Sequence, residues 1–324
     1  MRNVFLALGI ALAVGLFGEL AAATDDYPSR PVKIVVGIAP GGITDVTTRI
    51  YAEAVSKATG QNFVVENRPG GGGGIAANYV QNSPPDGYTL LSYLGSQQAA
   101  LPALQDVDFD PVKGFQQITL LFDLVIFVAV PENSPAHTVA ELLQVGRNNH
   151  RDLIFGSPGL GTPSHLLAAR ISQQTHTPMQ YVQYRGGSQM LVDLVAGRVD
   201  FALPSYTVSS SYLAAHKLRI LAVASDERLS AMPDVPTFKE AGLGGLKVAT
   251  WDGLAAPAGT PVSIVNKLHD EFQKASSDPE LKARLAANGT PILTSTPEEM
   301  TNILTEEVKQ SAILIKRLGL RQQQ

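Results

Sequence analysis

Residues 32–59 read VKIVVGIAPGGITDVTTRIYAEAVSKAT, and they contain a strand, a glycine turn and a helix in direct succession. The β-branched run Val32–Ile38 predicts a buried strand. Apolar residues at helical spacing predict a helix from Ile43 to Thr59, and Gly60 suits the left-handed position at its end. A strand that leads directly into a helix is typical of an α/β fold.

The same alternation continues along the chain. It predicts a β-α-β-α-β beginning and a second, similar unit from about residue 123, so that each lobe has a parallel-type sheet with helices on both faces. Further strands are predicted at 62–66, 88–94, 123–130, 152–157, 179–184, 199–203 and 218–224, and helices after the glycine run and at 138–149, 164–174 and 188–197.

The end of the chain contains mainly helices. Residues 246–261 predict a strand that leads into a loop, and helices follow at 261–276, 279–288 and 297–318. Thr296 and Glu299 form a predicted capping box at the start of the last of these helices. Because these helices have no strands of their own, we expect them to pack on the first lobe. The chain would then cross between lobes twice, near residues 125–130 and 247–252, which makes a two-strand hinge and a cleft that can close.

These crossings define the predicted domains. The first lobe comprises residues 24–125 and 250–324, and the second comprises residues 126–249. Residues 1–23 form a predicted signal peptide, with an uncharged stretch at 4–17 and small residues at Ala21 and Ala23 for cleavage.

The composition narrows the compartment and the partners. The net charge of −4 gives no support for nucleic-acid binding, and no cysteine is present for a lipid anchor, a disulfide or a thiolate site. Together with the cleavable signal peptide, this predicts a protein that diffuses freely in a bacterial periplasm, most simply as a monomer.

The glycine run in ENRPGGGGGIA, residues 66–76, resembles a phosphate loop only superficially. No lysine follows the glycines, which excludes a Walker loop, and the strand after them ends without the acid that a dinucleotide site needs. The sequence contains no metalloprotease or G-x-S-x-G motif either. We therefore predict no cofactor, no metal and no catalytic residues, and we interpret the run as a mobile rim of the first lobe.

The loop after the first strand is a better candidate site. Gly41 and Gly42 allow close approach of the backbone to a ligand, and the helix begins immediately after them. Its first amide groups can bind an anion without any basic side chain. Thr44 can add a hydroxyl group, and Asp45 can orient waters or brace the loop. An ordinary helix start contains the same residue types, so both interpretations stay open.

The second lobe contains a similar loop, GSPGLGTPSH, at residues 156–165. Ser157 and Thr162 offer hydroxyl groups, Gly161 frees the backbone, and His165 could contact a ligand or only cap the helix. Since ligands of open α/β sheets bind beyond the carboxyl ends of the strands, the two loops should face each other and form a receptor for a carboxylate.

A third loop, YRGGSQ at residues 184–189, precedes another predicted helix. Gly187 lies at the start of that helix, and Arg185 is either a partner for a carboxylate or a solvated surface residue. The single tryptophan, Trp251, lies on a predicted crossing strand, where it could wall the pocket or pack the hinge.

Taken together, these motifs resemble the Bug family, the periplasmic binding proteins of tripartite tricarboxylate transporters. The resemblance extends over nearly the whole mature chain and includes VVENRPGGGGGIAA, GSPGLGTPSH, YRGGSQMLVDLVAGRVDF and GLAAPAGTP. It implies a type II periplasmic-binding-protein fold, capture of a small organic carboxylate by backbone amides and ordered waters of the loop at 41–45, and inner-membrane transporter subunits as partners.

The sequence departs from the family pattern in three places along the chain. Ser96 with Gln97 and Gln98 stands where threonine or serine residues are frequent, Pro204 with Ser205 stands in place of an Asp-Asn pair, and Asp252 follows Trp251. An acid near the pocket would disfavour a second carboxylate or meet a ligand amine. The ligand is therefore open among a dicarboxylate, an aromatic carboxylate and an amino acid.

Two other functions are compatible with the sequence. An exported hydrolase could use Ser157 or Ser164 with His165, although no acid lies near His165 in the sequence to orient it. A binding protein that has become a ligand sensor would have the same sequence features. The absence of an assembled catalytic set favours a binding protein, not an enzyme.

Overall fold

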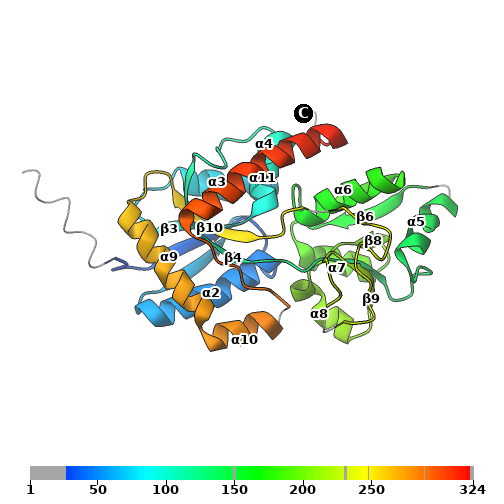
Figure 1. Ribbon diagram of the computed structural model, residues 1–324, viewed down its shortest axis with the longest axis horizontal. Helices are drawn as coiled ribbons and strands as arrows, with labels where there is room; N and C mark the ends of the chain where they lie inside the picture. The colour runs from blue at the N-terminus through cyan, green and yellow to red at the C-terminus, as the bar shows by residue number, and fades with distance from the viewer. Residues whose placement is uncertain (1–26, 149–150, 230–231, 247, 288, 322–324) are drawn as a thin grey trace, which may run out of the picture.

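The computed structural model of the protein describes residues 27–148, 151–229, 232–246, 248–287 and 289–321, so the predicted signal peptide lies outside the described residues. Two α/β lobes lie side by side, each with its own five-stranded sheet (Figure 1). The predicted two-lobe α/β architecture is therefore confirmed.

The sheet of the first lobe has the strand order β2-β1-β3-β10-β4. Strand β1 pairs in parallel with β2 and β3, whereas β10 is antiparallel to both β3 and β4. The sheet is therefore mixed, whereas the predicted sheet was of the parallel type. Its strands are β1 (Val32–Val36), β2 (Phe63–Asn67), β3 (Thr89–Leu94), β4 (Phe115–Phe122) and β10 (Asp252–Pro257).

The sheet of the second lobe has the order β7-β6-β8-β5-β9. Here β6 is parallel to β7 and β8, while β5 is antiparallel to β8 and β9. This sheet is mixed as well, because the strand that enters the lobe runs against its neighbours. Its strands are β5 (Phe127–Pro131), β6 (Leu153–Ser157), β7 (Met179–Gln183), β8 (Phe201–Ala202) and β9 (Leu218–Val223).

Helices cover both sheets (Figure 1). Those that connect the strands are α2 (Ile43–Thr59), α3 (Gly74–Gln81), α4 (Gly95–Leu104), α5 (Val139–Asn148), α6 (Pro163–Thr175), α7 (Gly187–Val195) and α8 (Tyr206–Ala214), and the short helix η1 (Gly71–Gly73) precedes α3. After β10 come α9 (Val262–Ser277), α10 (Pro279–Ala287) and α11 (Pro297–Leu318).

Local signals predicted several helices correctly. Helix α2 ends where predicted, with Gly60 in the left-handed conformation (φ 71°). Helix α11 begins with the predicted capping box, in which Thr296 accepts from the backbone of Glu299 and the Glu299 carboxylate accepts from the backbone of Thr296.

Three elements were missed, and one was misplaced. Helix α4 contains Pro102 and has no side-chain cap, α8 is rich in serine, and β4 carries two glutamines. Strand β10 lies within the predicted loop, because its sequence DGLAAP consists mainly of small residues without β-branching. All six of its residues are buried between β3 and β4, so tertiary packing determines this strand.

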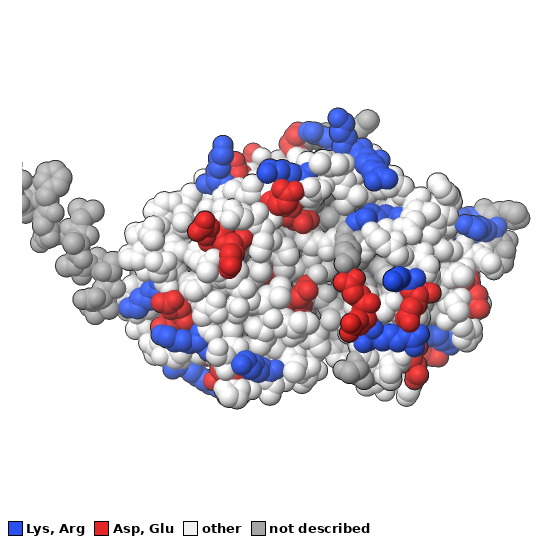
Figure 2. Space-filling model, in the orientation of Figure 1, with Lys and Arg blue, Asp and Glu red and all other residues white. Residues whose placement is uncertain are grey.

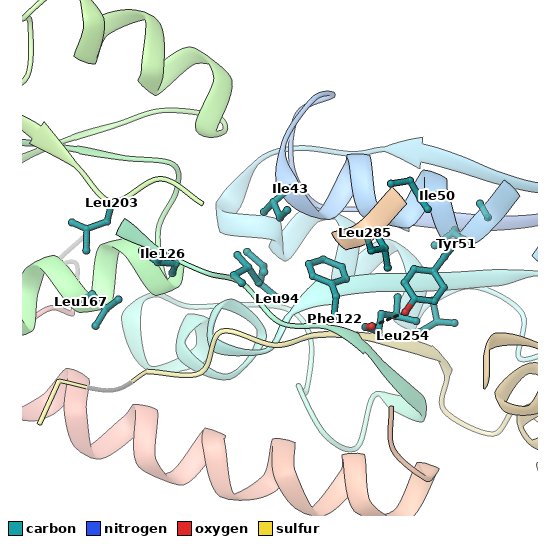
Figure 3. Packing of buried hydrophobic residues seen from close by; sticks show 14 of the residues in the cluster. Ile43, Ile50, Tyr51, Leu94, Phe122, Ile126, Leu167, Leu203, Leu254 and Leu285 are labelled. Atoms are coloured by element: carbon teal, nitrogen blue, oxygen red, sulfur yellow. Dashed lines mark hydrogen bonds between the residues drawn. The ribbon is translucent and has the colours of Figure 1, made fainter. Parts of the chain in front are cut away.

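The hydrophobic core continues from one lobe into the other. Figure 3 shows Leu203 and Ile126 of the second lobe in line with Leu94 and Ile43 of the first, all four belonging to one cluster of buried residues. The last three helices pack on the first lobe, as predicted. On α9, for example, Phe272 is fully buried against the rings of Tyr51 and Phe63.

Two isoleucines on α11 test this packing because they differ only in their surroundings. Ile315 is 2% exposed and Ile313 is 62% exposed. We expect Ile315→Ala to lower the free energy of unfolding by about 2–5 kcal/mol, since it leaves a cavity in the core. Ile313→Ala should change it by no more than about 0.5 kcal/mol. Urea unfolding measures both, and equal losses would contradict the packing of α11.

Candidate functional site

A small cavity lies between the lobes, at the point where five helices begin. Its volume is about 40 Å³. It is lined by the N-cap residues of α2, α4, α6, α7 and α8, which are Gly42, Leu94, Thr162, Gly186 and Ser205. Because α2 and α4 belong to the first lobe and the other three helices to the second, helix starts converge on this space from both sides.

These helix starts give the cavity a positive character without any basic side chain. The first amide groups of a helix have no partner within it, and the helix dipole places about half a positive charge there. Thr162 caps its own helix by accepting from the backbone of His165, but no side chain caps α2, α4, α7 or α8. Backbone donors of four helices are thus left for a ligand or water.

A polar recess of about 20 Å³ adjoins the cavity and shares Ile38 and Leu94 with it. The recess is lined on its polar side by Thr44, Ser92 and two glutamines of α4, Gln97 and Gln98. None of the described residues that line the cavity or the recess is Asp, Glu, Lys, Arg or His. The described part of the chain also holds no group of three metal-ligating side chains.

Several buried polar atoms around these spaces have no hydrogen-bond partner among the described residues. They are Ser96 Oγ, Gln98 Nε2 and Ser205 Oγ. Leaving a buried polar group unpaired costs about 1–3 kcal/mol, so such a cluster indicates a place for a ligand or ordered water. Ser96 and Ser205 are among the predicted ligand-binding residues, whereas Gln98 is predicted only as a departure from the family pattern. The position of Gln98 just beyond the carboxyl end of β3 is the signal that could have identified it.

Asp45 braces the loop after β1. Its Oδ2 accepts from the Gly41 amide at 2.8 Å, and its Oδ1 accepts from Asn67 Nδ2 at 2.8 Å and from Arg49. Burial acts to raise the pKa of Asp45, but these hydrogen bonds outweigh it and hold the pKa below the ordinary value. Asp45 therefore stays ionised and orders the loop. The amide group of Gly41 is already used in its hydrogen bond to Asp45.

Asp252, the first residue of β10, does not line the recess itself but is hydrogen-bonded to two residues that do. It is fully buried, and its two oxygens accept from the hydroxyl groups of Thr44 and Ser92, both at 2.9 Å. Burial raises the pKa of Asp252 well above the ordinary value, and the two hydrogen bonds oppose that shift only in part. The Asp252 carboxyl group thus holds the hydroxyl groups of Thr44 and Ser92 together at the recess.

The loop of the second lobe is braced internally. Ser157 Oγ donates to the carbonyl of Gly159 at 3.1 Å, and the Gly161 amide donates to His165 Nδ1 at 3.2 Å. The ring centroids of His165 and Tyr181 are 5.0 Å apart. Both residues line a separate cavity of about 310 Å³ beside α6 and the end of α11. Among the predicted residues of this loop, Thr162 and Ser164 line the cavity between the lobes, whereas Ser157, Gly161 and His165 do not.

The contacts of the two serines do not support the hydrolase hypothesis. Ser164 Oγ donates to the carbonyl of Leu203 at 2.6 Å, and Ser157 donates within its own loop. In the described structure neither hydroxyl is hydrogen-bonded to His165, whose Nδ1 already accepts from a backbone amide. A nucleophile requires an adjacent base, and these serines have none.

The lobes are in direct contact around the cavity. Ser188 Oγ donates to the Gly41 carbonyl at 3.0 Å, the Ala39 amide donates to the Arg185 carbonyl at 3.3 Å, and Gln97 Nε2 donates to the Leu160 carbonyl at 3.1 Å. The cleft between the lobes is therefore closed in this structure. Gly187 lines the cavity, whereas the Arg185 side chain is exposed and lines neither space.

The glycine run takes part in this contact. Gly72 has φ 63°, and a Cβ atom there would collide with the Leu101 side chain and come tightly against the Leu160 carbonyl. Gly72 and Gly73 also line the recess. The run is thus part of the contact between the lobes and needs glycine there, instead of forming only an outer rim as predicted.

Trp251 packs beside the site, not within it. Its carbonyl accepts from the Gly95 amide at 2.9 Å, and its ring lies edge-to-face against Tyr93 with centroids 6.0 Å apart. It lines neither the cavity nor the recess. Gly95 begins α4 and needs to be glycine, because a Cβ atom would collide with the indole ring.

Two lobes that close around a cavity lined by helix starts define a solute-binding protein of the periplasmic-binding-protein class. The chain matches the family described as "Tripartite tricarboxylate transporter family receptor" over residues 47–320, and it belongs to that family. The predicted relationship to Bug proteins is confirmed, and the chain is a binding protein, not an enzyme.

Relatives and solved structures agree with this assignment. The chain is 36% identical to the UPF0065 protein in the tcbD-tcbE intergenic region of Pseudomonas sp. (strain P51), across 97% of this chain and 94% of that protein. The periplasmic binding protein BugD superposes with a TM-score of 0.86 at 31% identity, covering 92% of this chain and 100% of BugD. An R. palustris protein solved with adipate gives 0.86 at 31% identity, covering 91% and 99%.

The buried His165 should make the protein sensitive to acid. Burial lowers the pKa of His165 from 6.5 to about 4. The unfolded chain therefore takes up a proton below pH 6.5 that the folded chain refuses until about pH 4. Stability present above pH 6.5 is lost across that window, by about 3 kcal/mol in total.

Denaturant unfolding between pH 7 and pH 4 measures this loss. We expect His165→Gln, which keeps an acceptor for the Gly161 amide, to show a smaller decrease than the unmodified protein. His137→Gln, at an exposed position, is the control and should lose as much stability between pH 7 and pH 4 as the unmodified protein. If His165→Gln also loses as much, the attribution of this loss to His165 is contradicted.

Proposed function

We propose that the protein captures a small organic carboxylate between its lobes and delivers it to a tripartite tricarboxylate transporter. The observation that carries the proposal is the convergence of five helix N-caps, from both lobes, on one cavity that no described charged side chain lines. Such a site attracts an anion through backbone dipoles.

The size and chemistry of the site suit a carboxylate better than a polyphosphate. The cavity is small, and none of the described residues that line it is basic. Membership of the receptor family and the adipate in a structure at 31% identity support the same ligand class. The proposal also explains why both lobes contribute donors, since an anion between them favours the closed state.

The proposed setting is the bacterial periplasm, reached through a cleavable signal peptide at residues 1–23. None of the described helices combines the length and the apolar character needed to cross a bilayer. Acidic and basic side chains are mixed over the face seen in Figure 2. We propose that the protein is a monomer and that its partners are the inner-membrane transporter subunits.

Binding of a carboxylate should raise the melting temperature. A screen of mono-, di- and tricarboxylates and amino acids by thermal shift should find at least one ligand that raises it by several degrees. Native mass spectrometry should show one ligand per chain, and the recovered ligand should be chemically unchanged. The absence of any stabilising carboxylate, or conversion of the ligand, would contradict the proposal.

Ser205 should contribute directly to this binding. A hydrogen bond to a charged group is worth about 1.5–3 kcal/mol, so Ser205→Ala should weaken binding by roughly ten- to a hundredfold. Ser210→Ala is a matched control on the same helix, because Ser210 lines neither space. Calorimetry on both variants measures the difference, and equal affinities would remove Ser205 from the site.

A further inference from the structure

One side chain of the second lobe is buried in the hydrophobic core of the first. Leu160 lies in the loop between β6 and α6 and is 3% exposed. It belongs to the same cluster of buried residues as Ala100, Leu101 and Leu104, which lie on α4 of the first lobe. Because this contact joins the two lobes, it is lost when the cleft opens.

The glycine run of the first lobe forms the other side of this contact. A Cβ atom built on Gly72 would lie 3.2 Å from the Leu160 carbonyl oxygen and 3.5 Å from the Leu160 Cβ atom, and it would collide with Leu101. We call the space between Gly72 and α4 that receives Leu160 the socket. A side chain on Gly72 would fill part of the socket, so the socket requires glycine at this position of the run.

The loop that carries this leucine is braced on both sides of it. The Gly159 carbonyl, just before the leucine, accepts from the hydroxyl groups of Ser157 at 3.1 Å and Thr162 at 2.8 Å. The Gly161 amide, just after it, donates to His165 Nδ1 at 3.2 Å. A preformed loop loses little conformational freedom when the lobes close, so more of the free energy of burial is available to hold them together.

Gln97 connects the socket to the candidate site. Its Nε2 donates to the Leu160 carbonyl at 3.1 Å, and the same side chain lines the polar recess. An amide nitrogen carries two hydrogens, so this group can hold Leu160 and also donate to a ligand in the recess. Closure of the lobes and occupation of the recess therefore share one side chain.

We infer that Leu160 is a positioning residue, which holds the two lobes closed by inserting into the socket and does so without touching the ligand. Leu160 lines neither the cavity nor the recess. Its burial stabilises the closed state alone, because an open cleft leaves the side chain in water. The apparent affinity of a ligand that binds the closed state rises with the closed fraction. The inference goes beyond the proposed function, since it applies to any ligand of the cleft.

Closure can be measured without a ligand. A Cβ atom on Gly186 of the second lobe would lie 3.7 Å from the Cβ atom of Ala39 in the first, which is the spacing found in a disulfide. The backbone of Gly186 is extended (φ 166°), so a cysteine fits there. Because the chain contains no cysteine, the pair Ala39→Cys and Gly186→Cys gives a single disulfide, whose equilibrium with glutathione reports the closed fraction.

Substitutions of Leu160 in this background test the inference. Leu160→Asp should lower the equilibrium constant for disulfide formation by at least about tenfold, because closure would bury an unpaired carboxylate in an apolar socket. Leu160→Ala removes only apolar area and should lower it by less. Val192→Asp adds the same charge at a position 53% exposed on α7 and should leave the constant unchanged. Equal constants for Leu160→Asp and Val192→Asp would overturn the inference.

A pair of glycine substitutions tests the socket from the first lobe. Gly71 and Gly72 have φ values of 55° and 63°, so alanine is strained to a similar degree at either position. At Gly72 the new Cβ atom meets Leu160 and Leu101, whereas at Gly71 its nearest described neighbour is 3.8 Å away. Gly72→Ala should therefore lower the disulfide constant in the same background, and Gly71→Ala should not. Equal effects would show that the run does not receive Leu160.

Melting curves of the reduced proteins establish that each variant is folded. We expect Leu160→Asp to fold, because residue 160 lies in solvent when the cleft is open. If that variant does not fold, the comparison of Gly72→Ala with Gly71→Ala decides the inference, and equal disulfide constants in those two variants would overturn it.

Discussion

The structure depends on the insertion of β10 between β3 and β4. The chain forms four strands of the first sheet, leaves to build the whole second lobe, and returns to add the strand that holds the first sheet together. All six residues of β10 are buried, and helices α9 and α11, which follow it, pack on the neighbouring strand β4. The first lobe is therefore incomplete until the second has been made, and the two connections between the lobes follow from this topology.

The same strand organises the candidate site. Asp252 at its start ties Thr44 of α2 to Ser92 of β3, and the carbonyl of Trp251 just before it holds the first amide of α4. Three elements around the recess are thus positioned by one short segment. A residue that does not line the recess thus positions two of the hydroxyl groups that do.

Sequence patterns predicted the parts of the fold that local chemistry determines. The spacing of apolar residues and a terminal glycine defined α2, and a capping box defined the start of α11. Strand β10 was placed in a loop by the prediction, because its small residues form a strand only through pairing with β3 and β4, which are distant in sequence. The helix-start loops were recognisable for the same local reason. Their convergence depends on the strand order, and the bond between Thr44 and Asp252 joins residues 208 positions apart, so neither could be predicted from the sequence.

The position of Trp251 has a practical consequence. The chain contains one tryptophan, so all of its indole fluorescence comes from this ring. The ring is 9% exposed and rests against Tyr93 and Gly95, at the beginning of the helix that carries Gln97 and Gln98. Any movement of that helix when the lobes separate alters the surroundings of the indole. The protein thus carries its own optical reporter of opening and closing, and the kinetics of the cleft can be followed without a label.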